Sequence, residues 1–203
     1  MRLGQNIEEV ARHKPDYMGF IFHPGSPRFA GNMLQPGVTA ALPSHIRKTG
    51  VFVNASTQYI EEICQKYDLN TVQLHGKEPI KQCSELKKLG YEVIKTFSLK
   101  NIDDIEQTSD YATACDYFLF DTPTSHHGGS GKKFDWSVLS GGTIERPFFL
   151  SGGIEEADAK TILDDPPIRP YAIDINSRFE TNPGIKNAEA VGRFIQAIRG
   201  SES

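Results

Sequence analysis

The sequence predicts a single α/β domain in which parallel strands alternate with helices. Short apolar runs alternate with longer amphipathic stretches throughout the 203 residues, and parallel strands require such crossover connections. The length fits one domain covering residues 1–203, and no linker or low-complexity segment interrupts the pattern. Seven strands are expected at a spacing of about 22 to 31 residues, which is typical of β/α units.

The first half of the chain is assigned from apolar spacing and from helix ends. Asn6 is the expected N-cap of the opening helix, Ser56 caps a later helix, and Gly90 stops a third, because glycine adopts the left-handed conformation that follows many helices. Helices are predicted over residues 6–12, 39–42, 56–67 and 78–89. Strands are predicted over the apolar runs 17–22, 49–53, 71–74 and 91–97.

The second half repeats the alternation. Strands are predicted over residues 117–120, 148–151 and 171–175, and helices over residues 101–109, 155–163 and 188–199. The glycine-rich stretch 125–133 is long for a loop in a compact domain. It is expected to be either a mobile lid over a ligand, containing Gly129, Ser130 and Gly131, or a flexible surface loop.

Seven strands are one fewer than a (β/α)₈ barrel needs. The chain opens on a helix with no strand before it. The residues alone therefore leave two possibilities: an unusual or open seven-stranded α/β sheet, or a barrel whose first strand is absent from the sequence. In a barrel the active site lies at the C-terminal ends of the strands, so the residues there are the first candidates.

Composition excludes several classes of partner. A net charge of −4 argues against a nucleic-acid surface, and the longest apolar runs fall far short of the about 20 residues that cross a membrane. The first residues lack the apolar core of a signal peptide. The three cysteines are widely spaced without a C-x-x-C motif, so reduced thiols in a cytoplasmic protein are expected, with no metal site.

Three ionisable residues at or after strand ends are candidates for chemistry. Asp121 follows an aromatic strand, where desolvation would raise its pKa and suit it as a general acid; a loop hydrogen-bond acceptor is the alternative. Arg28 lies in a stiff, proline-bounded loop, and its guanidinium suits a ligand carboxylate, unless it forms a surface salt bridge. His75 is either a ligand contact or a histidine satisfied within the protein.

Two neighbouring strand ends carry the residues expected to bind phosphate. Gly152 and Gly153 lead from a strand toward a helix, and glycine lets a ligand approach free backbone N–H groups there. Asn176 and Ser177 close the next strand. In barrels the last two strand ends form the usual phosphate pocket, although the glycines could simply make a tight turn.

Taken together, these motifs resemble the phosphoribosylanthranilate isomerase family, whose members are (β/α)₈ TIM barrels of tryptophan biosynthesis. The matching segments occur in family order: residues 19–22, 26–28, 50–54, 72–76, 93–95, 129–132, 134–136, 150–153, 174–177, 179–180 and 183–184. The resemblance implies a TIM barrel that acts on a small phosphoribosyl substrate without metal or organic cofactor.

The reaction implied by the resemblance is an Amadori rearrangement of N-(5-phosphoribosyl)anthranilate to 1-(2-carboxyphenylamino)-1-deoxyribulose 5-phosphate. In the family an acid protonates the ribose ring oxygen, and a base then removes the proton at C2. Asp121 matches the acid and Arg28 the residue that holds the anthranilate carboxylate. The substrate-binding set is completed by His75, Gly152, Gly153, Asn176 and Ser177.

The chain departs from the family pattern at its start. The family begins with a strand of the type Lys-(Ile or Val)-Cys-Gly-(Ile or Met), and its cysteine is the base. The sequence starts just after the corresponding position, so a barrel truncated at its N-terminus, without its first strand and base, is expected. Weak or absent activity follows, as does a homodimer through the exposed barrel edge.

Two other functions stay open from the sequence. One is a non-catalytic barrel that binds a phosphorylated ligand, which the missing base favours. The other is a different phosphosugar barrel enzyme. An epimerase-type site would need metal-binding His and Asp residues that the strand ends do not supply, whereas a synthase-type site needs a strand-end lysine, for which Lys95 is available.

Overall fold

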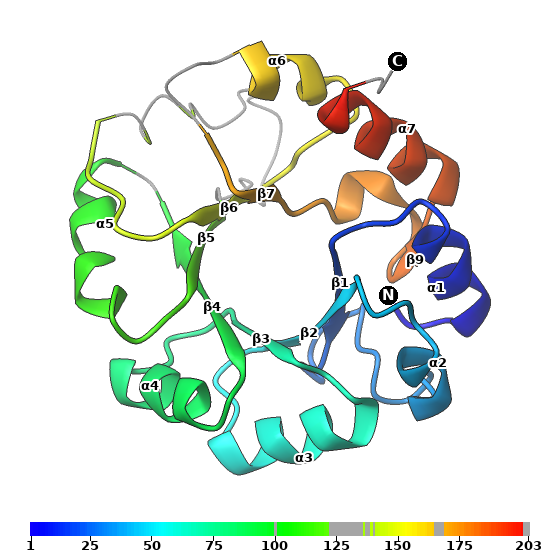
Figure 1. Ribbon diagram of the computed structural model, residues 1–203, viewed down its shortest axis with the longest axis horizontal. Helices are drawn as coiled ribbons and strands as arrows, with labels where there is room; N and C mark the ends of the chain where they lie inside the picture. Colours follow the sequence, from blue (N-terminus) through cyan, green and yellow to red (C-terminus); the bar gives the residue numbers. More distant parts are fainter. Residues whose placement is uncertain (100, 122–135, 137–138, 140, 165–168, 201–203) are drawn as a thin grey trace.

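Seven parallel strands run side by side in chain order and curve into an open ring (Figure 1). The computed structural model describes residues 1–99, 101–121, 136, 139, 141–164 and 169–200. The strands are β1 (Tyr17–Ile21), β2 (Arg47–Phe52), β3 (Thr71–Leu74), β4 (Glu92–Ser98), β5 (Tyr117–Asp121), β6 (Phe148–Leu150) and β7 (Ala172–Ile173). Each of the seven overlaps its predicted range, and the α/β architecture of TIM type is confirmed.

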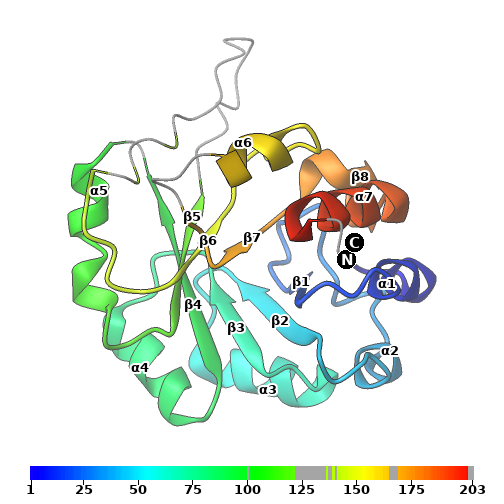
Figure 2. The same ribbon diagram turned by 45° about the horizontal axis from the view of Figure 1, so that its top comes forward.

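Helices cover the outside of the ring (Figures 1 and 2). They are α1 (Gly4–Ala11), α2 (Pro36–Ala40), α3 (Thr57–Tyr67), α4 (Ile80–Lys88), α5 (Asp103–Glu106), α6 (Asp158–Asp164) and α7 (Ala188–Arg199), with 3₁₀ turns η1 (Ser109–Tyr111) and η3 (Ser177–Phe179). In the part of the chain that the structure describes, no helix has the length and apolar character needed to span a membrane.

Two of the predicted helix ends are confirmed by their local geometry. The Ser56 side chain accepts a hydrogen bond from the Tyr59 backbone N–H at 3.2 Å and caps α3, which satisfies one of the free donors at a helix start. Gly90 follows α4 with φ of +92°, a conformation that costs little only for glycine.

Three predicted helix features are wrong. Asn6 is no N-cap: α1 begins at Gly4, and the buried Asn6 amide instead bonds the Lys186 backbone in both directions, at 2.8 and 2.7 Å. The helix expected from residue 155 begins at Asp158, which accepts a hydrogen bond from the Glu155 backbone N–H at 2.8 Å. The helix expected over 101–109 is broken near Thr108, whose hydroxyl bonds a backbone carbonyl.

A short hairpin near the C-terminus has no counterpart in the predicted elements. Strands β8 (Glu180–Asn182) and β9 (Ile185–Lys186) pair antiparallel, and Gly184 turns the chain between them with φ of +82°. The Asn6 side chain fastens β9 to α1. Strands this short do not form recognisable apolar runs, so no strand was predicted there.

Side chains alternate along each strand between the inside of the ring and the helices. Leu119 packs inside the ring with Ile94 and Phe149, whereas Phe118 and Phe120 belong to the larger cluster that includes the helices. Full burial of each such side chain contributes roughly 1.5–3 kcal/mol. Since alternate residues share a face, Asp121, two residues after Leu119, points to the inside of the ring.

Candidate active site

Four polar side chains from three strands or the residues after them converge inside the ring, at the C-terminal ends of the strands, which we call the mouth. Gln73 and His75 come from β3 and its continuation, Asp121 ends β5, and Asp174 follows β7. Gln73 Nε2 donates to Asp174 Oδ2 at 3.4 Å, and His75 Nε2 lies 3.8 Å from Asp121 Oδ2. Each of the two carboxylates thus faces one side chain supplied by β3.

The surroundings of both carboxyl groups raise their pKa values. Burial raises the pKa of Asp121 above its ordinary value, and the Asp174 charge raises it further, while the charge of His75 acts in the opposite direction. Burial also raises the pKa of Asp174, against the effects of Lys186 and the Gln73 hydrogen bond. A carboxyl group that keeps its proton to higher pH is suited to donate it to a substrate.

Arg28, in the loop after β1, is paired with a buried carboxylate. Its Nε donates to Glu180 Oε1 and Oε2 at 3.1 and 2.8 Å, and its Nη2 lies 2.7 Å from Oε2. The Glu180 side chain is only 4% exposed, against 24% for Arg28. Glu180 also accepts from Gly184 N at 3.1 Å and lies 3.3 Å from Lys186 Nζ. The predicted alternative was a surface salt bridge, whereas the structure shows a salt bridge to a buried carboxylate.

The predicted phosphate residues follow two neighbouring strands. Gly152 and Gly153 come after β6 with φ of +97° and +66°, where a side chain would strain the backbone. Asn176 and Ser177 come after β7, which pairs with β6. Lys186 Nζ donates to the Asn176 backbone oxygen at 2.9 Å and to its Oδ1 at 2.7 Å, so a buried cation holds this turn.

The comparison with known proteins decides the family. A family model described as N-(5'-phosphoribosyl)anthranilate (PRA) isomerase matches residues 1–197. The chain belongs to this family. It is 43% identical over 199 residues to the isomerase of Parabacteroides distasonis, covering 98% of this chain and 90% of the relative, so the family assignment rests on nearly the whole length of both.

Solved structures of the PRA isomerase family share the fold. The isomerase from Thermotoga maritima matches with a TM-score of 0.88 at 32% identity, covering 98% of this chain and 96% of that one. A structure of a phosphoribosyl anthranilate isomerase in complex with reduced 1-(o-carboxyphenylamino)-1-deoxyribulose 5-phosphate matches with a TM-score of 0.83 at 29% identity, covering 97% and 93% of the two chains.

Lys95 does not face the mouth, unlike the acid of a synthase-type barrel. It lies on the helix side of β4, because its neighbour Ile94 packs inside the ring. Its Nζ lies 2.9 Å from Glu78 Oε2 and donates to Gly76 O at 2.8 Å and Leu74 O at 3.2 Å. With these acceptors and a side chain 4% exposed, Lys95 is a structural cation.

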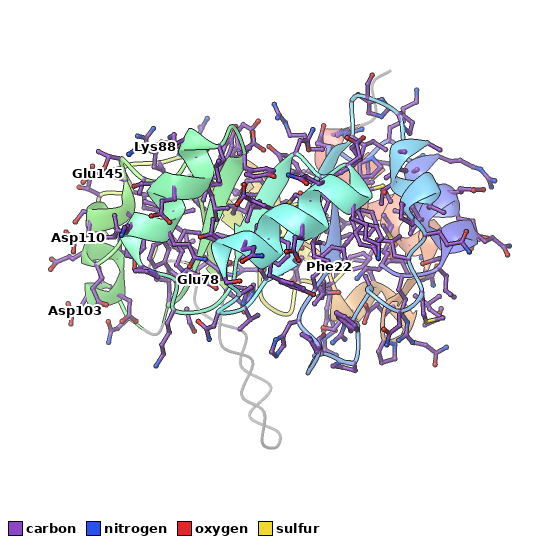
Figure 3. The ribbon with its side chains drawn as sticks, turned by 90° about the horizontal axis from the view of Figure 1, so that it is seen from below. Phe22, Glu78, Lys88, Asp103, Asp110 and Glu145 are labelled. Carbon is purple, nitrogen blue, oxygen red and sulfur yellow. The ribbon has the colours of Figure 1, made fainter. Side chains whose placement is uncertain are left out.

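The Lys95–Glu78 pair instead supports the loop that carries His75. Glu78 Oε1 accepts from the backbone N–H groups of Asn54 and Gly76 at 2.8 and 3.0 Å. Figure 3 shows Glu78 near the same face of the ring as Phe22, while Lys88, at the other end of α4, lies near the opposite face. The buried ion pair therefore fixes the mouth side of the β3–α4 connection.

Some predicted residues stay outside the site or outside the described residues. Gly129, Ser130 and Gly131, the predicted lid, lie outside the described residues. The three cysteines are free and buried. Two lie in α3 and α4 and the third precedes β5 at its N-terminal end, so none of them reaches the mouth.

Sequence reasoning gave no role to Gln73, Asp174, Glu180 and Lys186. Gln73 is a polar residue within an otherwise apolar strand, and Asp174 stands at a strand end, so both left a signal. Glu180 and Lys186 belong to the hairpin that the apolar pattern did not reveal. The partner of Glu180, Arg28, lies 152 residues away in sequence, and no local sequence pattern predicts such a pair.

Proposed function

We propose that this chain isomerises N-(5'-phosphoribosyl)anthranilate to 1-(2-carboxyphenylamino)-1-deoxyribulose 5-phosphate in tryptophan biosynthesis. The observation that carries the proposal is the family match over residues 1–197. The mouth agrees with it, since it presents Asp121 with a raised pKa, and Arg28 and the glycine pair follow other strands at the same end of the sheet. A cytoplasmic location, as predicted from the sequence, fits this role.

Asp121 is the proposed general acid. Protonated Asp121 gives its proton to the ribose ring oxygen as the bond between that oxygen and C1 breaks, and the anthranilate nitrogen supplies the electron pair that forms the Schiff base. Removal of a proton from C2 then gives the enolamine, which tautomerises to the product ketone. Desolvation of Asp121 supports this role, because it keeps the acid form available nearer to neutral pH.

The remaining candidates bind the substrate. Arg28 pairs with the anthranilate carboxylate through the guanidinium edge that Glu180 leaves free. Gly152 and Gly153 offer backbone N–H groups to the phosphate, together with the turn at Asn176 and Ser177. The remaining proposed contacts are His75, which lies beside Asp121, and the lid residues Gly129, Ser130 and Gly131.

The general base and the closure of the ring are proposed to come from one further parallel strand between β1 and β7. In the described sheet the strand next to β1 is β2 and the strand next to β7 is β6. Beyond β2, Ile21 of β1 forms only an isolated parallel bridge, to Phe29, among the described residues. The N-terminal nitrogen of Met1 donates to the carbonyl oxygen of Gly19, which lies within β1, at 2.9 Å. A second copy of the chain is the other proposed occupant of this edge; one Thermotoga maritima structure is described as a monomeric form of a dimeric isomerase.

Complementation of a tryptophan auxotroph that lacks its isomerase tests the proposal. The chain and a version extended at the N-terminus by about ten residues, roughly one strand and its lead-in, are expressed side by side. Growth without tryptophan by either version, abolished by Asp121→Asn, supports the isomerase. If both versions accumulate as folded protein and neither restores growth, the proposal fails.

A non-catalytic barrel that binds a phosphorylated ligand is the second candidate. It is favoured by one observation, that no cysteine of the described residues reaches the mouth to serve as the base. Binding of the reduced product analogue without turnover in either version would establish this function in place of the isomerase.

A further inference from the structure

We infer that Glu180 is a positioning residue, which fixes the Arg28 guanidinium so that its free edge meets the aryl carboxylate of the substrate. The identity of that ligand rests on the proposed function. The orientation of Arg28 by Glu180 does not, because it follows from contacts within the chain.

The geometry of the pair leaves one edge of Arg28 open. Nε and Nη2 are both engaged by the Glu180 carboxylate, at distances between 2.7 and 3.1 Å. Among the described residues, no hydrogen bond involves Arg28 Nη1. A planar guanidinium held along its Nε–Nη2 edge presents its remaining N–H groups, on Nη1 and Nη2, in a fixed direction, which is the arrangement that binds a second carboxylate end-on.

Glu180 is itself held rigidly. Besides Arg28 it accepts from the Gly184 N–H at 3.1 Å and from Lys186 Nζ at 3.3 Å. Burial alone would raise the pKa of Glu180, but the Arg28 hydrogen bond, the Lys186 charge and the Gly184 N–H lower it below its ordinary value. Glu180 is therefore ionised at neutral pH and cannot turn away from Arg28 without leaving a buried charge unpaired.

The charges of this cluster fit an anionic ligand. Two cations, Arg28 and Lys186, contact the one carboxylate of Glu180, and Asp174 is a further carboxyl group close enough to interact with Lys186. When Asp174 keeps its proton, which its raised pKa favours, one positive charge of the cluster is left for an anionic ligand. Lys186 also holds the backbone and side-chain oxygens of Asn176. The β8–β9 hairpin thus connects the residue proposed for the substrate carboxylate with a turn proposed for its phosphate.

A second glutamate–arginine pair in the chain provides a matched control. Arg193 donates to Glu156 through Nε at 2.6 Å and through Nη2 at 2.9 Å, the same forked arrangement. Both side chains are about half exposed, at 56% and 43%, and exposed pairs hold their geometry weakly. The two pairs differ in burial and in their place in the fold. Glu156→Gln therefore makes the same chemical change as Glu180→Gln, but in an exposed pair that does not include Arg28.

The first measurement needs no ligand. Hydrogen exchange of the Arg28 Nε–H, followed by NMR on the full chain labelled with ¹⁵N-arginine, reports whether the guanidinium is held. Slow exchange is expected in the unmodified chain and in Glu156→Gln, and exchange at least tenfold faster in Glu180→Gln. Equal exchange rates in all three would overturn the inference, because the Glu180 charge would then make no difference to how firmly Arg28 is held.

The second measurement tests carboxylate selectivity with two ligands: the reduced product analogue and the same molecule without its aryl carboxyl group. Glu180→Gln is expected to weaken binding of the carboxylated ligand ~10-fold, which corresponds to the loss of one charge-assisted hydrogen bond. Binding of the carboxylate-free ligand should change less than twofold. Equal weakening of both ligands would mean a structural role and contradict the inference.

A further variant and the unmodified chain distinguish failure of the inference from failure of the proposed function. If Glu180→Gln does not fold, Glu180→Asp takes its place. This variant retains the charge, but its side chain is one methylene shorter and no longer holds Arg28 in the same position, so the same loss of selectivity for the carboxylated ligand is expected. If the unmodified chain binds both ligands equally, the inference is wrong while the proposed function stands. If it binds neither ligand, the proposed function fails, and the exchange of the Arg28 N–H still decides whether Glu180 fixes the guanidinium.

Discussion

Asp121 of the mouth and Glu180 of the β8–β9 hairpin have pKa values shifted in opposite directions by their neighbours. Asp121 is partly buried near a second carboxylate, and its pKa is raised. The Glu180 side chain is only 4% exposed, against 34% for Asp121, but two cations and a backbone N–H contact it, and its pKa is lowered. Burial acts in the same direction on both, so the difference comes from the cations that touch Glu180 and from the like charge near Asp121.

The raised pKa of Asp121 predicts a variant that is more stable and less active. Because its pKa in the fold lies above that in the unfolded chain, ionised Asp121 destabilises the fold at about pH 7, and this cost vanishes below the ordinary pKa of aspartate, at about pH 3. Asp121→Asn should therefore raise Tm at about pH 7 and leave it unchanged at about pH 3. Turnover should fall ~10²–10⁴-fold. Thermal unfolding at both pH values, compared with Asp110→Asn on the surface, checks the prediction; a lower Tm at neutral pH would contradict it.

Helices and strands were predictable where local signals decide them. The Ser56 cap and the Gly90 stop are set by neighbouring residues, and both hold. Asn6 carries the same kind of capping signal, but its amide is recruited by the backbone of Lys186, 180 residues away. A tertiary partner thus overrode the local preference, and the same hairpin was too short to be recognised by its apolar pattern.

The loop after β6 should tolerate no side chain. Gly153 has φ of +66°, so Gly153→Ala is expected to cost about 1 kcal/mol of stability and to weaken phosphate binding. Gly90→Ala is the matched control. Gly90 also has a positive φ, a methyl group added there would meet no atom within 4 Å, and the residue lies away from the mouth. Urea unfolding and calorimetry with inorganic phosphate separate the effects. Equal phosphate affinity in both variants would contradict a role in phosphate binding.

The connection from β3 to α4 depends on its buried ion pair. Lys95→Met leaves the Glu78 carboxylate, 0% exposed, without its cation and should cost about 3–5 kcal/mol. Lys95→Met combined with Glu78→Gln should be less damaging than the sum of the single changes, because no buried charge remains. Lys81→Met, at an exposed pair with Glu85, should change stability by about 0.5 kcal/mol or less. Urea unfolding measures all four variants, and strict additivity would contradict the coupling.

The overall architecture followed from the sequence more completely than the site did. Alternating strands and helices leave few arrangements other than a parallel sheet wrapped in helices, and each of the seven predicted strands is present. The site depends on pairs distant in sequence, such as Gln73 with Asp174 and Arg28 with Glu180, which are 101 and 152 residues apart. Strand ends indicated which residues gather at the mouth, but not which of them pair.

Activity is expected to depend on what pairs with the open edges of the ring at β1 and β7. An unpaired edge strand exposes backbone groups that favour pairing with another strand, and the proposed base is expected on the strand that would fill this place. Activity is therefore expected to rise when the ring is completed. The geometry of Asp121, Arg28 and the glycine pair, built on the strands already present, should let the unextended chain bind the ligand.

Turnover of N-(5'-phosphoribosyl)anthranilate, followed by the loss of its fluorescence, tests the isomerase most directly. The purified chain, the version extended at the N-terminus and the Asp121→Asn variant of each are compared at equal concentration. The expected result is robust turnover by the extended chain, weak or no turnover by the unextended chain, and none above background by either variant. Turnover by neither version, with both folded, or turnover that survives Asp121→Asn, would contradict the assigned chemistry.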